Sequence, residues 1–352
     1  MKYYIGVDFH KQYSSVALMN EKGDIQDERK LFHVDEDKVI EYFAHFSDPG
    51  EVSVSIEATP NWYWFVDRLQ DLGLTVKLVH ARKAKIIAES TIKTDKLSAI
   101  ALAHLDRSNF LPTAYIADRG TRAARELLRY YMSLVKIRTS IKNRVHAILS
   151  KNNIHHGFSD LFGKKGMMFL LGLEMPPTFG TNLTGYLQLL ENVAQEISAA
   201  EKRIKEKCKG NRYFQRLVTI PGISHLTGLV LAVEIADIGR FSSYRKLCCY
   251  AGLVSSTYQS GDKMYHGHII KESNKYIRYV LIQAVPKAIG KDPRLYRFYK
   301  KIERKKGKNK AKIAVARKLL VAIYFMLRDD TDYCIDKKSG YSQVSPMAKL
   351  GA

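Results

Sequence analysis

The chain has 352 residues, and its 57 lysine and arginine residues against 35 aspartate and glutamate residues give a formal net charge of +22 at pH 7. Such an excess of positive charge points to a polyanionic partner, and a content of 46% hydrophobic residues excludes a largely disordered chain. No segment approaches the roughly 18 consecutive apolar residues that span a bilayer, and the N-terminus lacks the apolar stretch of a signal peptide. We therefore expect a cytoplasmic protein without a membrane partner.

The first hundred residues alternate between strand and helix patterns. Apolar or alternating runs predict strands at residues 3–7, 14–19, 24–32, 52–56 and 74–79. Gly23-Asp24 predicts a hairpin turn between the second and third strands. Helical patterns occupy residues 36–46, 62–72 and about 80–105. This order predicts a mixed sheet covered by helices, which is the α/β part of the fold.

The middle of the chain shows a seven-residue spacing of apolar side chains. The spacing begins after Thr121 and recurs later in the chain, at Leu127, Leu134, Ile141 and Ile148 and again at Leu183, Leu190, Ile197 and Ile204. Sustained heptads predict a helical hairpin or a coiled coil, either within one chain or between protomers. The intervening residues 152–182 are rich in Gly, Pro and Met, and we expect them to form a connector.

Basic residues gather in two helical segments. The first heptad helix carries cations at positions that the spacing predicts to face outward, and we expect a nucleic-acid contact from Arg122, Arg125, Arg129 and Lys136, the alternative being a solvated face. Residues 291–312 hold a denser group, interleaved with aromatic residues, and nucleic-acid binding is again the leading interpretation for Lys300, Lys301 and Arg304.

A Pro-Gly turn precedes an apolar helix predicted at residues 226–235. The segment Ile220-Pro221-Gly222-Ile223 is typical of a hairpin that joins two helices and exposes backbone N–H groups at a helix N-terminus. Such a turn can hold a DNA phosphate without reading sequence, so Gly222 is a candidate contact, although ordinary Pro-Gly turns are common.

Three carboxylates follow a pattern that could hold a metal. Asp8 and Glu57 each close an apolar strand, and Asp95 stands near the start of the helix expected to pack against that sheet edge. Three carboxylates around one point suit Mg²⁺, a hard cation that takes oxygen ligands and stabilises charge on a phosphoryl oxygen. A single strand-end aspartate is more often a cap or turn former, so the prediction depends on all three.

Ser260 is the candidate nucleophile. It stands beside Gly261 in a polar turn and is followed by cations able to stabilise a phosphorane-like transition state, Lys263, Lys271, Lys275 and Arg278. From spacing alone an ordinary Ser-Gly turn is the stronger alternative. No G-x-S-x-G pattern supports acyl transfer instead.

Six short motifs in chain order resemble those of the DEDD insertion-sequence transposases, a family that includes the Piv/MooV DNA invertases and the bridge-RNA-guided recombinases. They are Gly6-Val7-Asp8, Glu57-Ala58-Thr59, Lys93-Thr94-Asp95, Pro221-Gly222-Ile223, Tyr250-Ala251-Gly252-Leu253 and Tyr258-Gln259-Ser260-Gly261. The resemblance implies three regions. They are a RuvC-like, RNase H-type domain at 1–117, a helical coiled-coil region with a connector at 118–210, and a mainly helical C-terminal transposase domain at 211–352 with a helix-hairpin-helix-like element.

Roles for single residues follow from the same resemblance. It implies that Asp8, Glu57 and Asp95 are Mg²⁺ ligands and that Ser260 forms a covalent phosphoserine with DNA. The family's fourth acid falls three residues after Asp95, where this chain has Ser98. Asp106 cannot replace it, because eleven residues of helix span about 16 Å at 1.5 Å per residue. We therefore expect an impaired metal site.

The expected function is a transposase or recombinase of a mobile element in a prokaryotic nucleoid. The expected partners are double-stranded DNA, a noncoding guide RNA implied by the resemblance, and further copies of the chain, as a dimer that assembles into a tetramer. Two alternatives stay open: a decayed, non-catalytic nucleic-acid-binding relative, and a RuvC-like nuclease that does not use Ser260.

Overall fold

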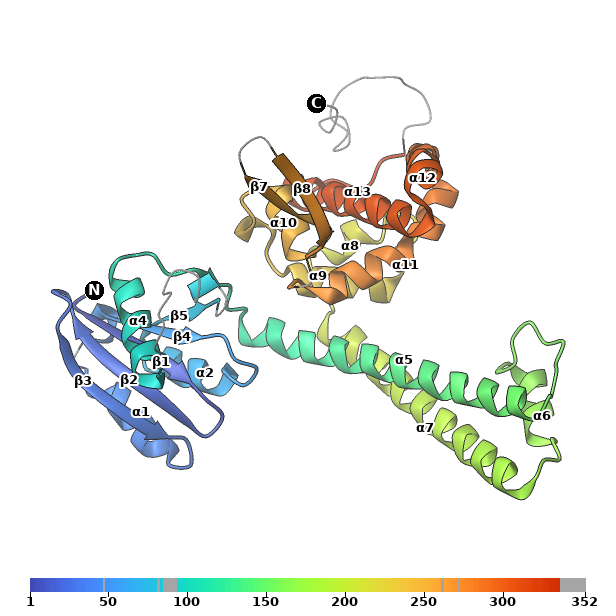
Figure 1. Cartoon of the computed structure of the whole chain (residues 1–352), viewed down its shortest axis with the longest axis horizontal. Coiled ribbons are helices and arrows are strands. Elements are labelled where there is room, and N and C mark those ends of the chain that lie inside the picture. The colour runs from blue at the N-terminus through green and yellow to red at the C-terminus, as the bar shows by residue number, and fades with distance from the viewer. Residues whose placement is uncertain (47, 81–82, 85–93, 261–262, 271, 336–352) are drawn as a thin grey trace. The chain divides into compact units, whose positions relative to one another are not determined.

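The computed structural model describes residues 1–46, 48–80, 83–84, 94–260, 263–270 and 272–335. For Tyr258, Ser260, Lys263 and His266 this description covers the backbone. Two compact units make up the chain, Met1–Ala117 and Asp118–Ala352 (Figure 1). The further division at residue 210 stays a prediction. Across the described residues, no helix combines the length and the apolar character needed to cross a membrane.

A six-stranded mixed sheet with the order β3-β2-β1-β4-β5-β6 forms the first unit (Figure 1). Its strands are β1 (Tyr3–Phe9), β2 (Tyr13–Asn20), β3 (Ile25–Phe32), β4 (Val52–Glu57), β5 (Thr75–Val79) and β6 (Thr113–Ala114). The sequence predicted the first five to within two residues at each end, and the turn between β2 and β3 contains Gly23 with φ of +100°. The sixth was missed because two residues carry no periodic pattern.

Helices cover both faces of this sheet. They are α1 (Glu36–Ala44), the short 3₁₀ helix η1 (Pro49–Glu51), α2 (Tyr63–Asp71) and α4 (Asp95–Arg107). Val7 of β1 belongs to the same buried cluster as Phe43 of α1 and Phe65 of α2. Side chains alternate between the faces of a strand, so the even-numbered positions of β1 face the other way, toward α4.

Gly6 lets α4 approach β1 closely. A Cβ atom added at Gly6 would lie 1.9 Å from the carbonyl oxygen of Ala99 and 2.7 Å from the amide nitrogen of Ala103. Such distances leave room only for a hydrogen atom. The glycine of the Gly6-Val7-Asp8 motif is therefore required by helix packing, and it brings the first turn of α4 over the neighbouring residue Asp8.

The predicted helix at 80–105 is wrong as a single element. Thr94 has an extended backbone and caps a separate helix, its Oγ1 accepting a hydrogen bond from the amide of Leu97 at 3.2 Å. A threonine at this position satisfies an N–H group that has no partner within the helix, so α4 starts at Asp95. Residues 85–93 lie outside the described part of the chain.

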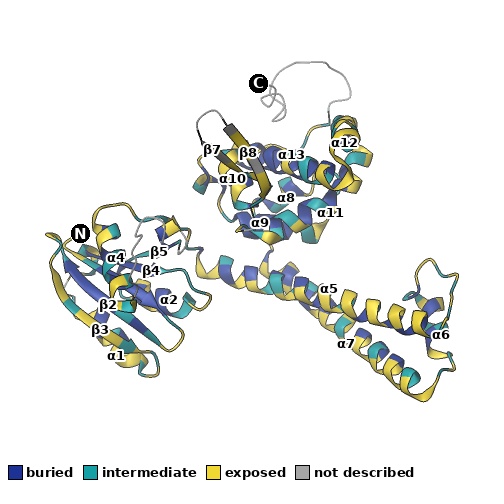
Figure 2. Ribbon diagram, in the orientation of Figure 1, coloured by how far each residue is buried: buried dark blue, intermediate teal, exposed yellow. Residues whose placement is uncertain are grey.

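The second unit contains the predicted helical hairpin. Its two long helices are α5 (Arg119–Lys151) and α7 (Pro177–Lys207), and α6 (Lys164–Leu171) lies between them in sequence. Leu134 near the middle of α5 packs with Ile197 late in α7, whereas Ile148 packs with Leu183 early in α7, so the helices run antiparallel. Buried and exposed positions alternate along both (Figure 2). The expected connector 152–182 is only partly irregular, because it includes α6 and the start of α7.

Helices α8–α13 and one β-hairpin complete the second unit. The elements are α8 (Phe214–Leu217), α9 (His225–Ile235), the 3₁₀ helix η2 (Ile238–Arg240), α10 (Tyr244–Tyr250), β7 (Ser255–Ser260), β8 (Lys263–Ile269), α11 (Lys275–Lys291), α12 (Pro293–Lys306) and α13 (Lys308–Asp329). Helices α9, α11 and α13 share one buried core, and α13 is largely buried along its length (Figure 2). The fold is thus a mixed α/β unit followed by a mainly helical one.

Candidate active site and nucleic-acid interface

The carboxyl ends of two parallel strands bring Asp8 and Glu57 to one edge of the sheet. In the β1–β4 pairing Val7 is opposite Ile56, and Asp8 and Glu57 are the next residue of each strand. Glu57 lies close enough for its charge to raise the pKa of Asp8. The expectation that these two strand-end acids converge is therefore confirmed.

Helix α4 adds Asp95 and Ser98 to the same point. One turn separates them on the helix, so they share a face. The Ser98 hydroxyl lies close enough to the carboxylate of Asp8 to lower its pKa slightly, and Asp95 receives a hydrogen bond at its Oδ2 from the hydroxyl of Tyr13 at 2.8 Å. Position 98 therefore lies beside the acids, as expected from the resemblance to the DEDD transposases, in which this position carries the fourth acid.

His10 is a member of this cluster that the sequence did not predict. Its Nε2 atom lies 3.4 Å from Asp95 Oδ2 and 3.6 Å from Asp8 Oδ2. Among the described residues, Asp8, His10 and Asp95 form a group whose ligand atoms all lie within 4.8 Å of one another. Two of the three predicted metal ligands, Asp8 and Asp95, belong to this group, and Glu57 does not.

The protonation of the two closest acids differs for physical reasons. Burial raises the pKa of Asp8, and the nearby carboxylates of Glu57 and Asp95 add to the rise. The hydrogen bond from Tyr13 lowers the pKa of Asp95, whose side chain is 44% exposed. A divalent cation here would offset the repulsion between these carboxylates. The donor set of carboxylate oxygens and one imidazole nitrogen fits such an ion.

Asp106 serves a different purpose. Its side chain is buried and accepts hydrogen bonds from Ser53 Oγ at 2.7 Å and from Lys77 Nζ at 2.6 Å. Both partners come from the sheet beneath α4, so Asp106 ties the C-terminal half of the helix to β4 and β5. This agrees with its predicted distance from the metal-site acids.

The β7–β8 hairpin carries Ser260 at the end of its first strand, where the backbone of Ser260 pairs with that of Lys263. Gly252 lies just before the hairpin with φ of +64°, and a Cβ atom there would approach Ser273 Oγ to 2.2 Å. Arg278 donates hydrogen bonds to the carbonyl of Ile270 at 3.2 Å and to Ser273 Oγ at 3.1 Å. These contacts fix the base of the hairpin. Lys271 lies outside the described residues.

Glu234 on α9 is a buried carboxylate with three partners. Arg129 Nε donates to its Oε1 at 3.0 Å, and Asn274 Nδ2 donates to its Oε2 at 2.7 Å. Arg125 lies 3.6 Å away and donates to the backbone carbonyls of Val233 and Glu234. Asn274 also caps α11 through its side chain. One carboxylate thus joins α5, α9 and the segment after the serine hairpin.

The predicted outward placement of three arginines is therefore wrong. Arg122 and Arg125 are 4% and 8% exposed, and Arg129 is half-buried against Glu234. The first turns of α5 pack against α9, so the face that points away from α7 is covered by a second neighbour. Lys136, further along the same helix, is exposed as expected.

The other predicted cations differ in how freely they face solvent. Lys275, Lys301 and Arg304 are exposed, whereas Lys300 pairs with Glu303 at 2.8 Å. Gly222 has φ of +91°, and a Cβ atom there would lie 2.6 Å from the carbonyl oxygen of Ala284 on α11. The positive φ and the close approach to α11 explain why a glycine is needed at position 222, whether or not it contacts DNA.

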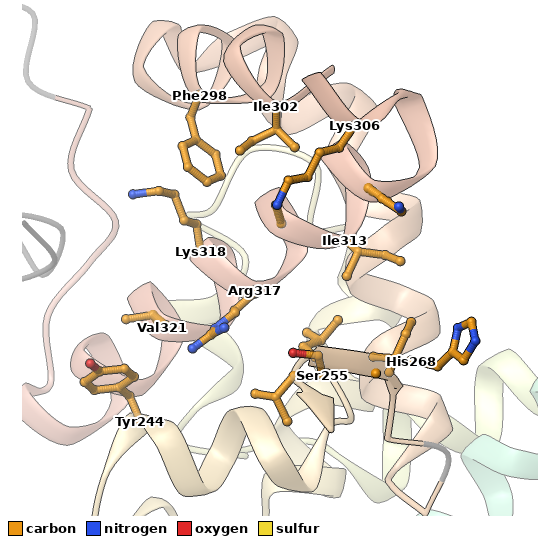
Figure 3. Close-up of a pocket in the computed structure, with 16 residues that line it drawn as sticks. Tyr244, Ser255, His268, Phe298, Ile302, Lys306, Ile313, Arg317, Lys318 and Val321 are labelled. Atoms are coloured by element: carbon orange, nitrogen blue, oxygen red, sulfur yellow. The ribbon is translucent and has the colours of Figure 1, made fainter. Parts of the chain in front are cut away.

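A groove beside the hairpin offers a concentrated basic surface (Figure 3). Its volume is about 800 Å³, and residues from α10, β7, β8, α12 and α13 line it. The cations among them are Lys306, Lys310, Arg317 and Lys318. Lys318 Nζ lies 4.6 Å from the centroid of the Phe298 ring, and burial lowers the pKa of this lysine. Ser255, on the same strand as Ser260, reaches into the groove (Figure 3).

Two family models match the chain. One, described as "Transposase IS116/IS110/IS902 family", matches residues 214–300, and the other, described as "Transposase" and specific to the DEDD domain of the IS110 group, matches residues 5–154. The first match includes the hairpin and Ser260, and the second includes all of the acids. The resemblance inferred from the six sequence motifs is confirmed.

Similar proteins support the same family assignment. The transposase for insertion sequence element IS1111A of Coxiella burnetii is 25% identical over 94% of this chain and 91% of its own length. A probable family 20 transposase of Pseudomonas aeruginosa is 22% identical over 80% of this chain and 85% of its own. The pilin gene-inverting protein of Moraxella bovis is 37% identical over 33% of this chain and 37% of its own. The chain therefore belongs to the IS110 family of insertion-sequence transposases, enzymes that cut and rejoin DNA.

Proposed function

We propose that this transposase cuts and rejoins DNA through Ser260 and that Mg²⁺ is held by Asp8, Glu57 and Asp95 on a RuvC-like, RNase H-type domain. The observation that carries the proposal is the convergence of Asp8 and Asp95 from two elements on one point, with their ligand atoms within reach of a single ion. The strand-end position of Glu57 beside Asp8 supports a third ligand.

The residues around this point have separable tasks. Bound Mg²⁺ supplies a positive charge that stabilises negative charge on a phosphoryl oxygen. The Ser98 hydroxyl favours the ionised form of Asp8, and Tyr13 keeps Asp95 ionised and oriented by donating to its Oδ2. Because Tyr13 stands on β2 and Asp95 on α4, their hydrogen bond also fixes the start of the helix over the sheet.

The strand-transfer step balances without an external energy source. The Ser260 Oγ atom bonds to phosphorus while the bond from phosphorus to one deoxyribose oxygen breaks; the serine proton is lost to solvent, and the leaving deoxyribose oxygen takes up a proton to become a free hydroxyl. The phosphoserine keeps the energy of the phosphodiester. A hydroxyl of the partner strand then attacks phosphorus and loses its proton, the Oγ–P bond breaks, and Ser260 takes up a proton again.

DNA binding is supported by the groove beside the hairpin. The groove is lined by cations from two helices, Lys306 of α12 and Lys310 and Arg317 of α13, and it lies next to the strand that ends in Ser260. Contacts of lysine and arginine with phosphates are independent of sequence, so such a surface orients a strand without choosing it. Target choice then needs another component, consistent with the guide RNA implied by the family resemblance.

The partner proposals extend to RNA and to further copies of the chain. Exposed apolar side chains on the α5–α7 hairpin, Tyr130, Ile137 and Leu189, supply surface for a dimer that assembles into a tetramer. Light scattering with and without DNA tests the assembly, and sequencing of RNA that co-purifies with the chain tests the guide. A monomer at all concentrations with DNA present would contradict the assembly.

The decisive experiment traps a covalent adduct. End-labelled DNA carrying a family target site is incubated with the chain and Mg²⁺ and separated on a denaturing gel. The wild type should give a labelled protein band, and Ser260→Ala should give none while retaining DNA affinity within a few-fold, since the hydroxyl adds no charge. Ser255→Ala and Ser256→Ala, on the same strand, are matched controls that keep the band.

Each other outcome rejects part of the proposal. Metal-dependent cleavage without an adduct identifies a nuclease that does not use Ser260, and DNA binding without cleavage identifies a non-catalytic relative. Mass spectrometry that places the phosphodiester on Ser255 or Ser256 would show that the wrong serine of this hairpin has been assigned.

A further inference from the structure

His10 is placed in the acidic cluster by a short turn. β1 ends at Phe9, and the amide of His10 donates to the carbonyl of Tyr13 at 2.9 Å, closing the turn that leads into β2. The imidazole packs against the Tyr13 ring at a centroid distance of 4.7 Å. These contacts direct Nε2 back over Asp8, while the side chain as a whole stays 38% exposed.

The Nε2 atom of His10 is shielded from solvent and makes no hydrogen bond to the described residues. Its distances of 3.4 Å to Asp95 Oδ2 and 3.6 Å to Asp8 Oδ2 exceed the 2.7–3.2 Å of a good hydrogen bond. A shielded nitrogen that faces two carboxylates only at these distances is weakly satisfied, which is costly. An ion bound between the three groups would satisfy it.

We propose that His10 Nε2 is a ligand of the divalent ion, and that this nitrogen donor shifts the preference of the site from Mg²⁺ toward Mn²⁺. The inference rests on the metal site of the proposed function. Mn²⁺ also takes oxygen ligands, but as a transition-metal ion it accepts an imidazole nitrogen more readily than Mg²⁺, a harder ion that keeps an all-oxygen shell. Ser98 contributes a neutral hydroxyl to this cluster, and His10 contributes a nitrogen donor whose atom lies within 4.8 Å of the ligand atoms of Asp8 and Asp95.

A different role for His10 predicts an effect of the opposite sign. If His10 acted as a protonated partner of the two carboxylates, its positive charge would compete with a metal, and its removal would tighten metal binding. A ligand must be neutral at Nε2, and its removal weakens binding. The direction of the change in metal affinity therefore separates the two roles.

The test uses the full-length chain with Mn²⁺ as the probe. Pulsed electron paramagnetic resonance should detect coupling of bound Mn²⁺ to a directly coordinated ¹⁴N nucleus in the wild type, and labelling the protein with ¹⁵N-histidine should change that coupling. His10→Ala should abolish it and weaken Mn²⁺ binding by about tenfold or more, on the scale of the losses seen for disturbed metal sites. Mg²⁺ binding, measured by competition, should weaken less.

Two further variants complete the test. His104→Ala changes an exposed histidine on the helix that carries Asp95, and it should keep both the nitrogen coupling and the affinity. Asp8→Asn should remove most Mn²⁺ binding. Absence of nitrogen coupling in the wild type, or unchanged or tighter binding in His10→Ala, overturns the inference while Asp8→Asn still confirms the metal site. Absence of saturable Mn²⁺ binding in the wild type rejects the site itself. The isotope experiment needs no variant, so a poorly folding His10→Ala leaves the inference testable.

Discussion

Ser98→Asp restores a carboxylate at the position where the family has its fourth acid, and it should tighten Mg²⁺ binding. The Ser98 hydroxyl lies close enough to the Asp8 carboxylate to lower its pKa. Two unit charges 4 Å apart interact by about 1 kcal/mol in water, so an added carboxylate gains about 2 kcal/mol with a divalent ion. Repulsion between the new carboxylate and Asp8 acts with and without the ion, so it largely cancels in the binding free energy. The gain of about 2 kcal/mol corresponds to roughly thirtyfold tighter binding.

The same substitution should destabilise the protein without metal. It removes a hydroxyl that favours the ionised form of Asp8 and adds a negative charge to those of Asp8, Glu57 and Asp95. We therefore expect a loss of about 1 kcal/mol in the free energy of unfolding in EDTA, turning into a gain at Mg²⁺ concentrations well above the dissociation constant. The variant should therefore be less stable than the wild type in EDTA and more stable at high Mg²⁺. This reversal indicates a new metal ligand, because a substitution without a role in metal binding would change the free energy of unfolding equally with and without Mg²⁺.

Isothermal titration with Mg²⁺ and urea unfolding with and without Mg²⁺ measure the two effects. Ser98→Asn is the matched control, because it has nearly the size of aspartate, lacks the serine hydroxyl and carries no charge. Cleavage across a Mg²⁺ titration should also reach half its maximum at a lower concentration in Ser98→Asp. Equal Mg²⁺ affinity in the Asp and Asn variants would refute the metal-ligand role of this position, and the role of Asp95 one turn earlier with it.

Three further predictions test the packing and the charge around both sites. Gly6→Ala should lower the free energy of unfolding by at least about 1–3 kcal/mol and weaken Mn²⁺ binding, because its Cβ would lie 1.9 Å from a backbone oxygen of α4. Gly157→Ala is the control: open space surrounds this glycine, so its melting temperature should not change. Glu234→Ala should cost about 3–5 kcal/mol in urea unfolding because it removes the buried carboxylate that faces Arg125 and pairs with Arg129, against less than about 1 kcal/mol for the exposed Glu126→Ala. Lys310→Ala should lower the log–log salt slope of DNA affinity by about one unit if it contacts one phosphate, and an unchanged slope would remove it from the interface.

The strands of the sheet were predictable because the sequence pattern of each strand and turn is local. Apolar runs such as Val52–Ile56, followed by a polar residue, indicate both the strand and the side chain that ends it. The convergence of Asp8 and Glu57 then followed from the parallel pairing of neighbouring strands. No such rule places His10, because a turn has no periodicity and its ring orientation depends on a contact with Tyr13. The signal that could have found it is its spacing, two residues after a strand-end acid.

The arginines of α5 show why a correct helix can still be misread. The heptad spacing correctly identified the face that packs on α7, and it classed the opposite face as exposed. Near the start of α5, however, that opposite face meets α9, where Glu234 receives Arg129 and lies beside Arg125. A heptad repeat identifies the face that packs against one partner helix. Where a helix packs between two neighbours, the repeat gives no sign of the second contact. The clue was on α9: a lone carboxylate in an otherwise apolar helix requires buried cations as its partners, and Arg125 and Arg129, one turn apart on α5, supply them.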